Sequence, residues 1–354
     1  MQQLSIQERG ETAEGWQAVV RFNNGPENPI TISNPFTDKE EKELEWYFEE
    51  HLEFPFTQKV RAREAARSIV TYGEKLFDQV FGDRDIYDEY RDLLKAGLSS
   101  VQIEIEGEPK FHALHWETIK DPKFAQPLAL QATMVRKNRQ KQILPLPVRP
   151  SPIINLLVVT ARPSGTRDVG YRTISSPLVE ALRNANLRVQ VEILRPGTYK
   201  ALVNHLSQIT AKHGEGHYHV IHFDMHGAVL TFKQIQSIQQ KPANKPLQYK
   251  PYAHKEIQPY EGIKAFLSFE PEADDEDTEK KPDLVEASDL AALLVAHQIP
   301  ITILNACQSG KQVGERETSL GSHLVQQGVQ LVLAMGYSVT VSAAEWAARA
   351  KPRC

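Results

Sequence analysis

Two short segments of the sequence each carry one side chain that could take part in nucleophilic catalysis. The first is VIHFDMHG (220–227), in which His226 precedes Gly227, and the second is ITILNACQSG (301–310), which contains Cys307. A cysteine thiol is mostly protonated at neutral pH, and a nearby imidazole can take its proton or, once protonated, hold the thiolate. The pair therefore predicts attack by a thiolate on a carbonyl carbon.

The backbone beside both residues could stabilise the charge that forms in such a reaction. The tetrahedral intermediate carries an oxyanion, to which backbone N–H groups can donate hydrogen bonds. Gly227 lets the backbone come close to a substrate, and Ser309 and Gly310 keep the loop after the cysteine small. The N–H groups of Gly227 and Cys307 are therefore the predicted oxyanion hole.

Three further side chains are candidates for binding a substrate. Asp224 precedes His226 by two residues, so on a regular strand both point to the same side, where Asp224 could orient the imidazole or shape the pocket for the substrate. Phe269, on a predicted strand at 263–270, could line the pocket wall, and Glu315, in a polar loop, could favour a basic side chain. The simpler alternatives are a polar strand end, core packing and a solvated loop, respectively.

No metal site is expected. Histidines 217, 219, 222 and 226 lie close in sequence. However, side chains alternate along a strand, which turns 222 and 226 away from 217 and 219 and leaves no clear set of metal ligands. The chain also lacks the GxxxxGK[ST], GxGxxG and GxSxG patterns, which argues against a nucleotide-binding or serine-hydrolase domain.

The elements that would position these residues alternate between strand and helix in the second part of the chain. Predicted strands lie at 154–161, 188–194, 218–227, 301–310 and 329–337, and predicted helices lie at 176–186, 199–214 and 287–298. Short apolar runs suit strands buried on both faces of a parallel sheet wrapped by helices. Active sites in such sheets lie beyond the carboxyl ends of the strands, so His226 and Cys307 would face one crevice if their strands are neighbours.

The first part of the chain, 1–145, is predicted to be a smaller α+β region. Strands are expected at 15–22 and 100–107, and Thr37 with Glu40 forms a capping-box pattern at the start of a helix. The proline-rich segment ILPLPVRPSP is typical of an extended linker. It predicts a boundary before a second domain at 151–354.

The composition limits the kinds of partner that the protein could bind and the cellular compartment in which it is expected. The 354 residues carry a net charge of −4, from 41 basic and 45 acidic side chains, which gives no basic surface for nucleic acid. No apolar run of about 18 residues predicts a membrane span, and the N-terminus lacks the pattern of a secretory signal. Two cysteines, Cys307 and Cys354, cannot form a disulfide framework, so a cytoplasmic location is predicted.

The two reactive segments resemble a known family. DMHG (224–227) and NACQSG (305–310) resemble the His-Gly and Ala-Cys blocks of caspase-like peptidases, which include caspases, legumains, gingipains and separases. FHALHWETI (111–119) is similar to the His-x-Leu-Pro-Trp-Glu block of the CHAT family (caspase HetF associated with tetratricopeptide repeats), with His115 in place of the usual proline. Segments 284–294 and 331–348 also resemble this mainly bacterial family, and the resemblance covers about 110–348.

This resemblance implies a caspase-haemoglobinase fold, preceded by a pseudo-caspase-like region, and an endopeptidase that cleaves protein substrates with His226 and Cys307 as its dyad. It implies no cofactor, and it implies control by an activating partner or by additional domains in regulated proteolysis. Family members usually continue past the YSVTV segment with a helix and further structure, so a C-terminal truncation is predicted. The alternative is a catalytically inactive caspase-like scaffold or interaction protein.

Overall fold

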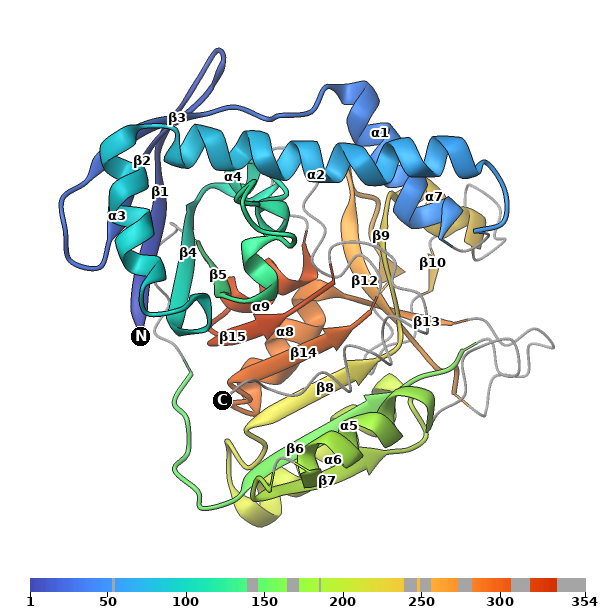
Figure 1. Ribbon diagram of the computed structural model, residues 1–354. Helices are drawn as coiled ribbons and strands as arrows, with labels where there is room; N and C mark the ends of the chain where they lie inside the picture. The colour runs from blue at the N-terminus through green and yellow to red at the C-terminus, as the bar shows by residue number, and fades with distance from the viewer. Residues whose placement is uncertain are drawn as a thin grey trace. The chain divides into compact units, whose positions relative to one another are not determined.

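The chain divides into two compact units in the computed structural model (Figure 1). The first consists chiefly of Met1–Lys141, and the second chiefly of Gln142–Lys311 and Glu317–Pro352. The structure describes residues 1–52, 55–138, 146–163, 172–184, 186–238, 247–248, 256–272, 282–306 and 319–335. The alternation of strands and helices predicted for the second part is confirmed, as is the mixed α/β class.

The first unit is built on a five-stranded mixed sheet in the order β3-β2-β1-β4-β5. Its strands are β1 (Gln2–Thr12), β2 (Gly15–Phe22), β3 (Asn28–Ile32), β4 (Val101–Gly107) and β5 (Thr133–Asn138). Strand β1 pairs antiparallel with β2 and parallel with β4, and β4 pairs parallel with β5. The parallel half of this sheet, β1-β4-β5, is therefore formed by segments far apart in sequence.

Two of the four α-helices described in the first unit, the first and the third, begin at a residue whose side chain caps them. The four helices are α1 (Asp38–Trp46), α2 (Lys59–Phe81), α3 (Arg84–Leu94) and α4 (Pro109–His112), with short turns η1 (Tyr47–His51), η2 (Leu98–Ser100), η3 (Trp116–Thr118) and η4 (Leu128–Leu130). The predicted capping box is confirmed: the Thr37 side chain accepts a hydrogen bond from the Glu40 N–H, and the Glu40 carboxylate accepts one from the Thr37 N–H. Asp83 caps α3 through its side chain alone, which accepts hydrogen bonds from the N–H groups of Asp85 and Ile86.

The second unit contains a five-stranded sheet in the order β15-β14-β8-β6-β7, and every neighbouring pair in it is parallel. These strands are β6 (Ile154–Thr160), β7 (Val189–Leu194), β8 (Val220–Asp224), β14 (Ile301–Asn305) and β15 (Leu331–Leu333). An antiparallel sheet, β13-β12-β9, consists of β9 (His226–Leu230), β12 (Lys264–Phe269) and β13 (Asp283–Glu286). Strands β10 (Leu247–Gln248) and β11 (Glu256–Ile257) form a short pair.

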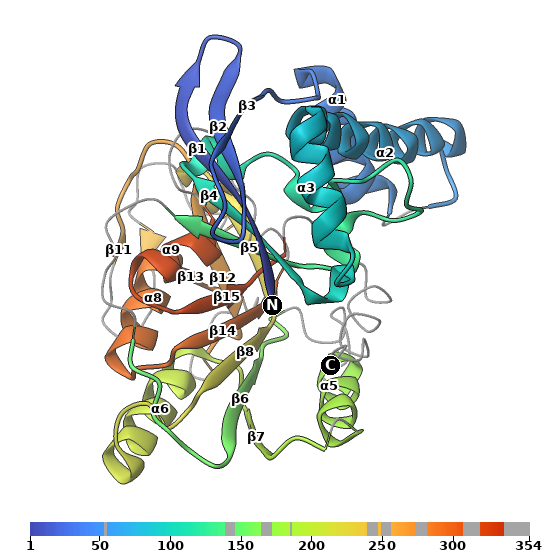
Figure 2. The same cartoon turned by 60° about the vertical axis from the view of Figure 1, so that its left-hand side comes forward.

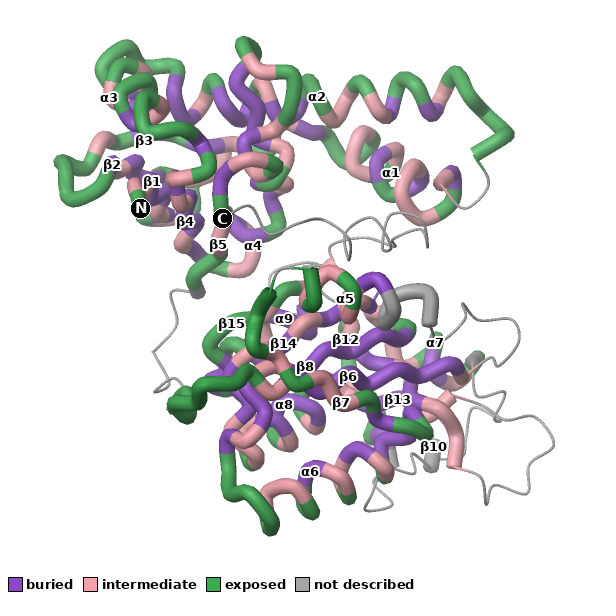
Figure 3. Tube along the Cα trace, turned by 60° about the horizontal axis from the view of Figure 1, so that its bottom comes forward, coloured by how far each residue is buried: buried purple, intermediate pink, exposed green. Residues whose placement is uncertain are grey.

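Helices cover both faces of the parallel sheet. The helices described in the second unit are α5 (Arg172–Asn184), α6 (Tyr199–His213), α7 (Phe232–Ile238), α8 (Ala287–Ala296) and α9 (Leu320–Gln326). In Figure 2, α6, α8 and α9 lie on one face of this sheet and α5 lies on the other. The core on the first face joins buried side chains of the strands to those of α6 and α8, among them Leu157, Ile221, Phe223, Leu202, Leu206, Leu290 and Leu294. In Figure 3 much of the sheet and part of both helices are coloured as buried.

One strand prediction was wrong in a way that matters for the site. The segment 218–227 was expected to form a single strand, but β8 ends at Asp224 and β9 begins at His226 in a different sheet. The alternation rule for one strand therefore does not apply across Met225. It gives no support for placing the side chains of Asp224 and His226 on the same side.

Within the described part of the chain, no helix has the length and apolar character needed to cross a membrane.

Candidate active site

The two reactive segments begin with neighbouring parallel strands. Strand β8 lies between β14 and β6, and at its last position Asp224 is in register with Asn305 of β14 and Thr160 of β6. His226 follows Asp224 by two residues, and Cys307 follows Asn305 by two residues. The condition for a shared crevice, that the two strands are neighbours, is thus met. Cys307 itself lies outside the described residues, so its predicted role stays a prediction.

His226 is presented at the start of an antiparallel strand. It pairs with Ser268 of β12, and the next residue, Gly227, pairs with Leu267. The residue before it, Met225, is buried and donates its N–H to the Asn305 carbonyl oxygen at 3.3 Å, whereas His226 is exposed. The chain thus fixes Met225 in the core and leaves the imidazole of His226 accessible to a substrate.

The carboxylate of Asp224 is buried and forms hydrogen bonds within the protein. Its Oδ2 accepts a hydrogen bond from Arg162 Nη2 at 2.5 Å, and its Oδ1 accepts one from Asn305 Nδ2 at 2.9 Å. The side chains of Asp224 and Arg162 are each 5% exposed. A buried carboxylate paired with a guanidinium is not available to a basic substrate side chain. These contacts favour a structural role over the predicted substrate contact.

Phe269, the second substrate-binding candidate, is a core residue. Its side chain has no exposed surface, and its ring packs edge-on against Tyr199 at 5.4 Å and Phe223 at 6.4 Å between ring centroids. Such edge-to-face contacts are typical of aromatic cores. The packing favours the alternative interpretation of Phe269, and the third candidate, Glu315, lies outside the described residues together with Ser309 and Gly310.

Glu270, which sequence reasoning missed, ties together the loops that follow three strands. Its Oε1 accepts the Arg162 N–H at 2.9 Å, and its Oε2 accepts the Gly197 N–H at 3.0 Å. Its own N–H donates to the Gly197 carbonyl oxygen at 2.9 Å. Any Cβ at Gly197 would overlap the Thr160 carbonyl oxygen, which explains a glycine at this close approach. The loops after β6, β7 and β12 therefore share one carboxylate.

The histidines of this region do not form a metal site in the part of the chain that the structure describes, where no group of three or more potential ligands occurs. His219 accepts the Asn155 N–H at Nδ1 and contacts the Arg149 carbonyl oxygen through Nε2, each at 3.0 Å. His217 stacks on His213 at 4.4 Å, and burial, with the charge of His213, lowers the pKa of His217. These contacts hold the imidazoles in place without an ion.

His222 lies in the middle of β8, two residues before Asp224, and it predicts an effect of pH on stability. Burial lowers the pKa of His222 to about 4, although the Asp224 carboxylate acts in the opposite direction. Among the described residues, its Nδ1 has no hydrogen-bond partner. The folded protein therefore holds this imidazole neutral, whereas in the unfolded chain it has an ordinary pKa of about 6.5.

Acid should therefore destabilise the second unit through His222. Above pH ~6.5, His222 is neutral in both the folded and the unfolded state, so its burial costs no stability. As the pH falls from about 6.5 toward 4, only the unfolded state gains a proton, and the unfolding equilibrium constant should rise up to about tenfold per pH unit. We expect His222→Leu to flatten this dependence in urea unfolding curves. Parallel curves for wild type and His222→Leu would show that His222 is not the group responsible.

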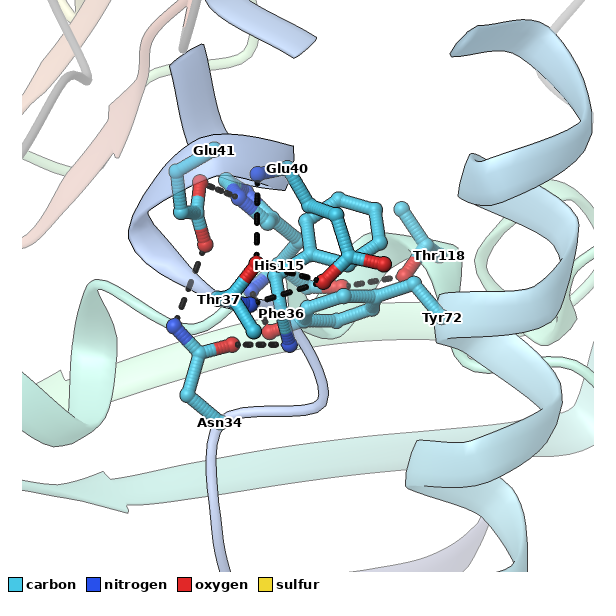
Figure 4. Close-up of polar contacts among 8 residues, drawn as sticks. All are labelled: Asn34, Phe36, Thr37, Glu40, Glu41, Tyr72, His115 and Thr118. Carbon is cyan, nitrogen blue, oxygen red and sulfur yellow. Dashed lines mark hydrogen bonds and ion pairs between the residues drawn. The ribbon is translucent and has the colours of Figure 1, made fainter. Parts of the chain in front are cut away.

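The segment 111–119 forms a packed turn in the first unit (Figure 4). His115 Nε2 lies 2.9 Å from Glu41 Oε2 of α1, and the His115 N–H donates to the Tyr72 hydroxyl at 3.1 Å. Burial alone would raise the pKa of Glu41, but hydrogen bonds from His115 and Asn34 and the charge of His115 hold it below its usual value. A proline at 115 could make neither of these two contacts, because it lacks both the imidazole and the N–H.

Comparison with known proteins places the whole arrangement in a family. The family model described as the CHAT domain matches residues 72–350, well over half of the chain. The match begins at Tyr72 in α2, contains the 111–119 turn, and continues through both reactive segments. No curated protein compared with the sequence matches it. Because the match covers most of the chain, this protein belongs to the CHAT domain family, a caspase-like peptidase family.

Proposed function

We propose that this chain is a cysteine endopeptidase of caspase-like fold that cleaves protein substrates, with Cys307 as nucleophile and His226 as general base. The observation that carries the proposal is the register of β8 and β14. Asp224 pairs with Asn305, and the two reactive residues follow this pair at equal distance along the chain. A thiol and an imidazole placed after neighbouring parallel strands suit the carboxyl-end location of active sites in such sheets.

The proposed reaction is acyl transfer through a thioester. His226 takes the proton of the Cys307 thiol, and the thiolate attacks the scissile carbonyl carbon. The N–H groups of Gly227 and Cys307 stabilise the oxyanion, and the imidazolium then protonates the leaving amine. Water attacks the thioester with His226 as base, which releases the carboxylate product and restores the thiol. No cofactor takes part in these steps.

Glu315 is the substrate-binding candidate that this proposal retains. Asp224 is neutralised by Arg162, and Phe269 is enclosed in the core, so neither supplies a recognition group. A carboxylate at 315, eight positions after the nucleophile, would favour a basic side chain next to the scissile bond. The preferred substrate in this proposal is a protein segment with Lys or Arg at that position.

The proposal places the peptidase chemistry in residues 151–354 and treats 1–145 as a pseudo-caspase-like region. The parallel pairing of β1, β4 and β5 supports this treatment, because it resembles one half of an α/β sheet. A nucleophilic thiol persists best in the reducing cytoplasm, which we propose as the location. An activating partner or a further domain is proposed to control the reaction.

Cleavage of a positional-scanning library of fluorogenic peptides tests the proposal. We expect turnover by the purified chain with a preference for a basic residue before the scissile bond, and loss of turnover after alkylation of the thiol. Turnover that survives alkylation would contradict a thiol nucleophile. If the chain cleaves no peptide, the result would favour the alternative that it is a catalytically inactive scaffold.

A further inference from the structure

We propose that Arg162 is a positioning residue of this active site, which holds the end of β8 before His226 and the end of β12, the strand beside it. The inference rests on the proposed roles of His226 and Cys307. It concerns a residue two positions after the end of β6, distant in sequence from both of them. Arg162 lies 62 residues from Asp224, the residue with which it pairs.

The guanidinium of Arg162 fixes the end of β8. Nη2 donates to the Asp224 carboxylate, and Nη1 donates to the Asp224 carbonyl oxygen at 2.7 Å and to the Ala161 carbonyl oxygen at 2.9 Å. The Ala161 N–H also donates to the Asp224 carbonyl oxygen at 3.2 Å. Both the main chain and the side chain of Asp224 are thus held, and only Met225 separates this anchored residue from His226.

The backbone of Arg162 fixes the strand that pairs with His226. The Arg162 N–H donates to Glu270, the residue that directly follows β12, and β12 places Ser268 opposite His226. One residue therefore anchors β8 before the histidine and β12 beside it. Asn305 extends the same network to β14, because its side chain donates to the Asp224 carboxylate two residues before Cys307.

Burial explains why an arginine suits this task. A buried ion pair adds little net stability compared with apolar side chains of similar size, but it fixes geometry where its hydrogen bonds are satisfied. The planar guanidinium donates in several fixed directions at once, which a lysine ammonium cannot reproduce. Arg162 is enclosed and its charge is balanced by Asp224, so it is not a binding group for an acidic substrate.

The rate of covalent labelling of Cys307 by a peptidyl acyloxymethyl ketone tests the proposal, with kinact and KI measured separately. We expect Arg162→Lys to lower kinact by about 10-fold to 100-fold, because misplacement of reacting groups by about 1 Å has effects of this size. KI should stay within about twofold, since Arg162 does not touch the substrate. The double variant Arg162→Met/Asp224→Asn removes both charges of the buried pair. We expect it to be more stable than Arg162→Lys, but its kinact should remain low.

A stability control separates positioning from simple destabilisation. Leu206 is a buried core residue of α6, and Leu206→Ala should lower stability by a similar amount. We expect Leu206→Ala to keep wild-type kinact below its unfolding temperature. The proposal would be overturned if Arg162→Lys kept the kinact of the wild type. It would also be overturned if Leu206→Ala lowered kinact as much as Arg162→Lys does.

Amide hydrogen exchange provides a readout that does not depend on activity. In the double variant, the amides of Ala161 and Met225 should exchange at least about tenfold faster, while the centres of β6 and β8 keep their protection. If the wild type is not labelled at Cys307, the proposed function fails and this measurement alone decides the inference. Unchanged protection of Ala161 and Met225 would overturn the positioning role in either case.

Discussion

Cys307→Ala and His226→Ala are each expected to lower kcat/KM for peptide hydrolysis by at least about 10³-fold. The first change removes the only atom that attacks the carbonyl carbon in the proposed reaction. The second leaves a thiol that is mostly protonated at neutral pH and an amine that leaves without general-acid assistance. Both residues follow strand ends that are in register, so neither replacement should disturb the buried parts of β8 and β14.

Two matched replacements serve as controls for this prediction. Cys354→Ala removes the other cysteine of the chain, and His213→Ala removes another exposed histidine. Both should keep kcat/KM within about twofold of the wild type, since neither residue belongs to the proposed dyad. Full activity in His226→Ala would mean that another group is the base, and residual turnover that depends on Cys354 would remove Cys307 from the mechanism.

Phe269→Ala is expected to lower the free energy of unfolding by about 3–5 kcal/mol. The ring is fully enclosed and packs on Tyr199 and Phe223, so its removal leaves a cavity in the core of the second unit. Phe269→Leu should cost less, because it retains most of the buried apolar volume. Urea unfolding followed by circular dichroism measures both changes.

The control for Phe269 is the same substitution at an exposed position. Phe56 is 84% exposed, and Phe56→Ala should change stability by less than about 0.5 kcal/mol. Under the pocket-wall interpretation, Phe269→Leu would instead alter the preference among substrate peptides with little change in stability. That result would show that the ring contacts substrate and that our core assignment is wrong.

The parallel sheet could be predicted because β6 is a short, nearly continuous apolar run and β7 alternates apolar and polar residues. The expected strands at 154–161 and 188–194 correspond to β6 and β7, and the neighbouring order of β8 and β14 satisfies the condition stated for the crevice. Strand β1 was not predicted, since polar residues interrupt it and its pairing shifts between Glu8 and Gly10. A bulge of this kind breaks the alternation on which strand prediction depends.

The break between β8 and β9 could not be read from the sequence. From Ile221 to His226 apolar and polar residues alternate, which is the pattern of one continuous strand, and buried Met225 fits that pattern. What ends β8 is its network of tertiary contacts, in which Arg162 and Asn305 hold Asp224 across 62 and 81 residues of sequence. Hydrophobic periodicity reflects only the local sequence, so it carries no information about contacts between residues this far apart in the chain. An arginine two residues after the end of β6 is the sequence feature that accompanies this network.

The central claim is that Cys307 is an activated thiol paired with His226, and intact-mass labelling with peptidyl acyloxymethyl ketones tests it most directly. The account predicts one adduct on the wild type, mapped by peptide sequencing to Cys307, and no adduct on Cys307→Ala or His226→Ala. It also predicts faster labelling by probes with Lys or Arg beside the reactive group. Equal labelling of Cys354 and Cys307, or labelling of Cys307 that is unaffected by His226→Ala, would contradict it.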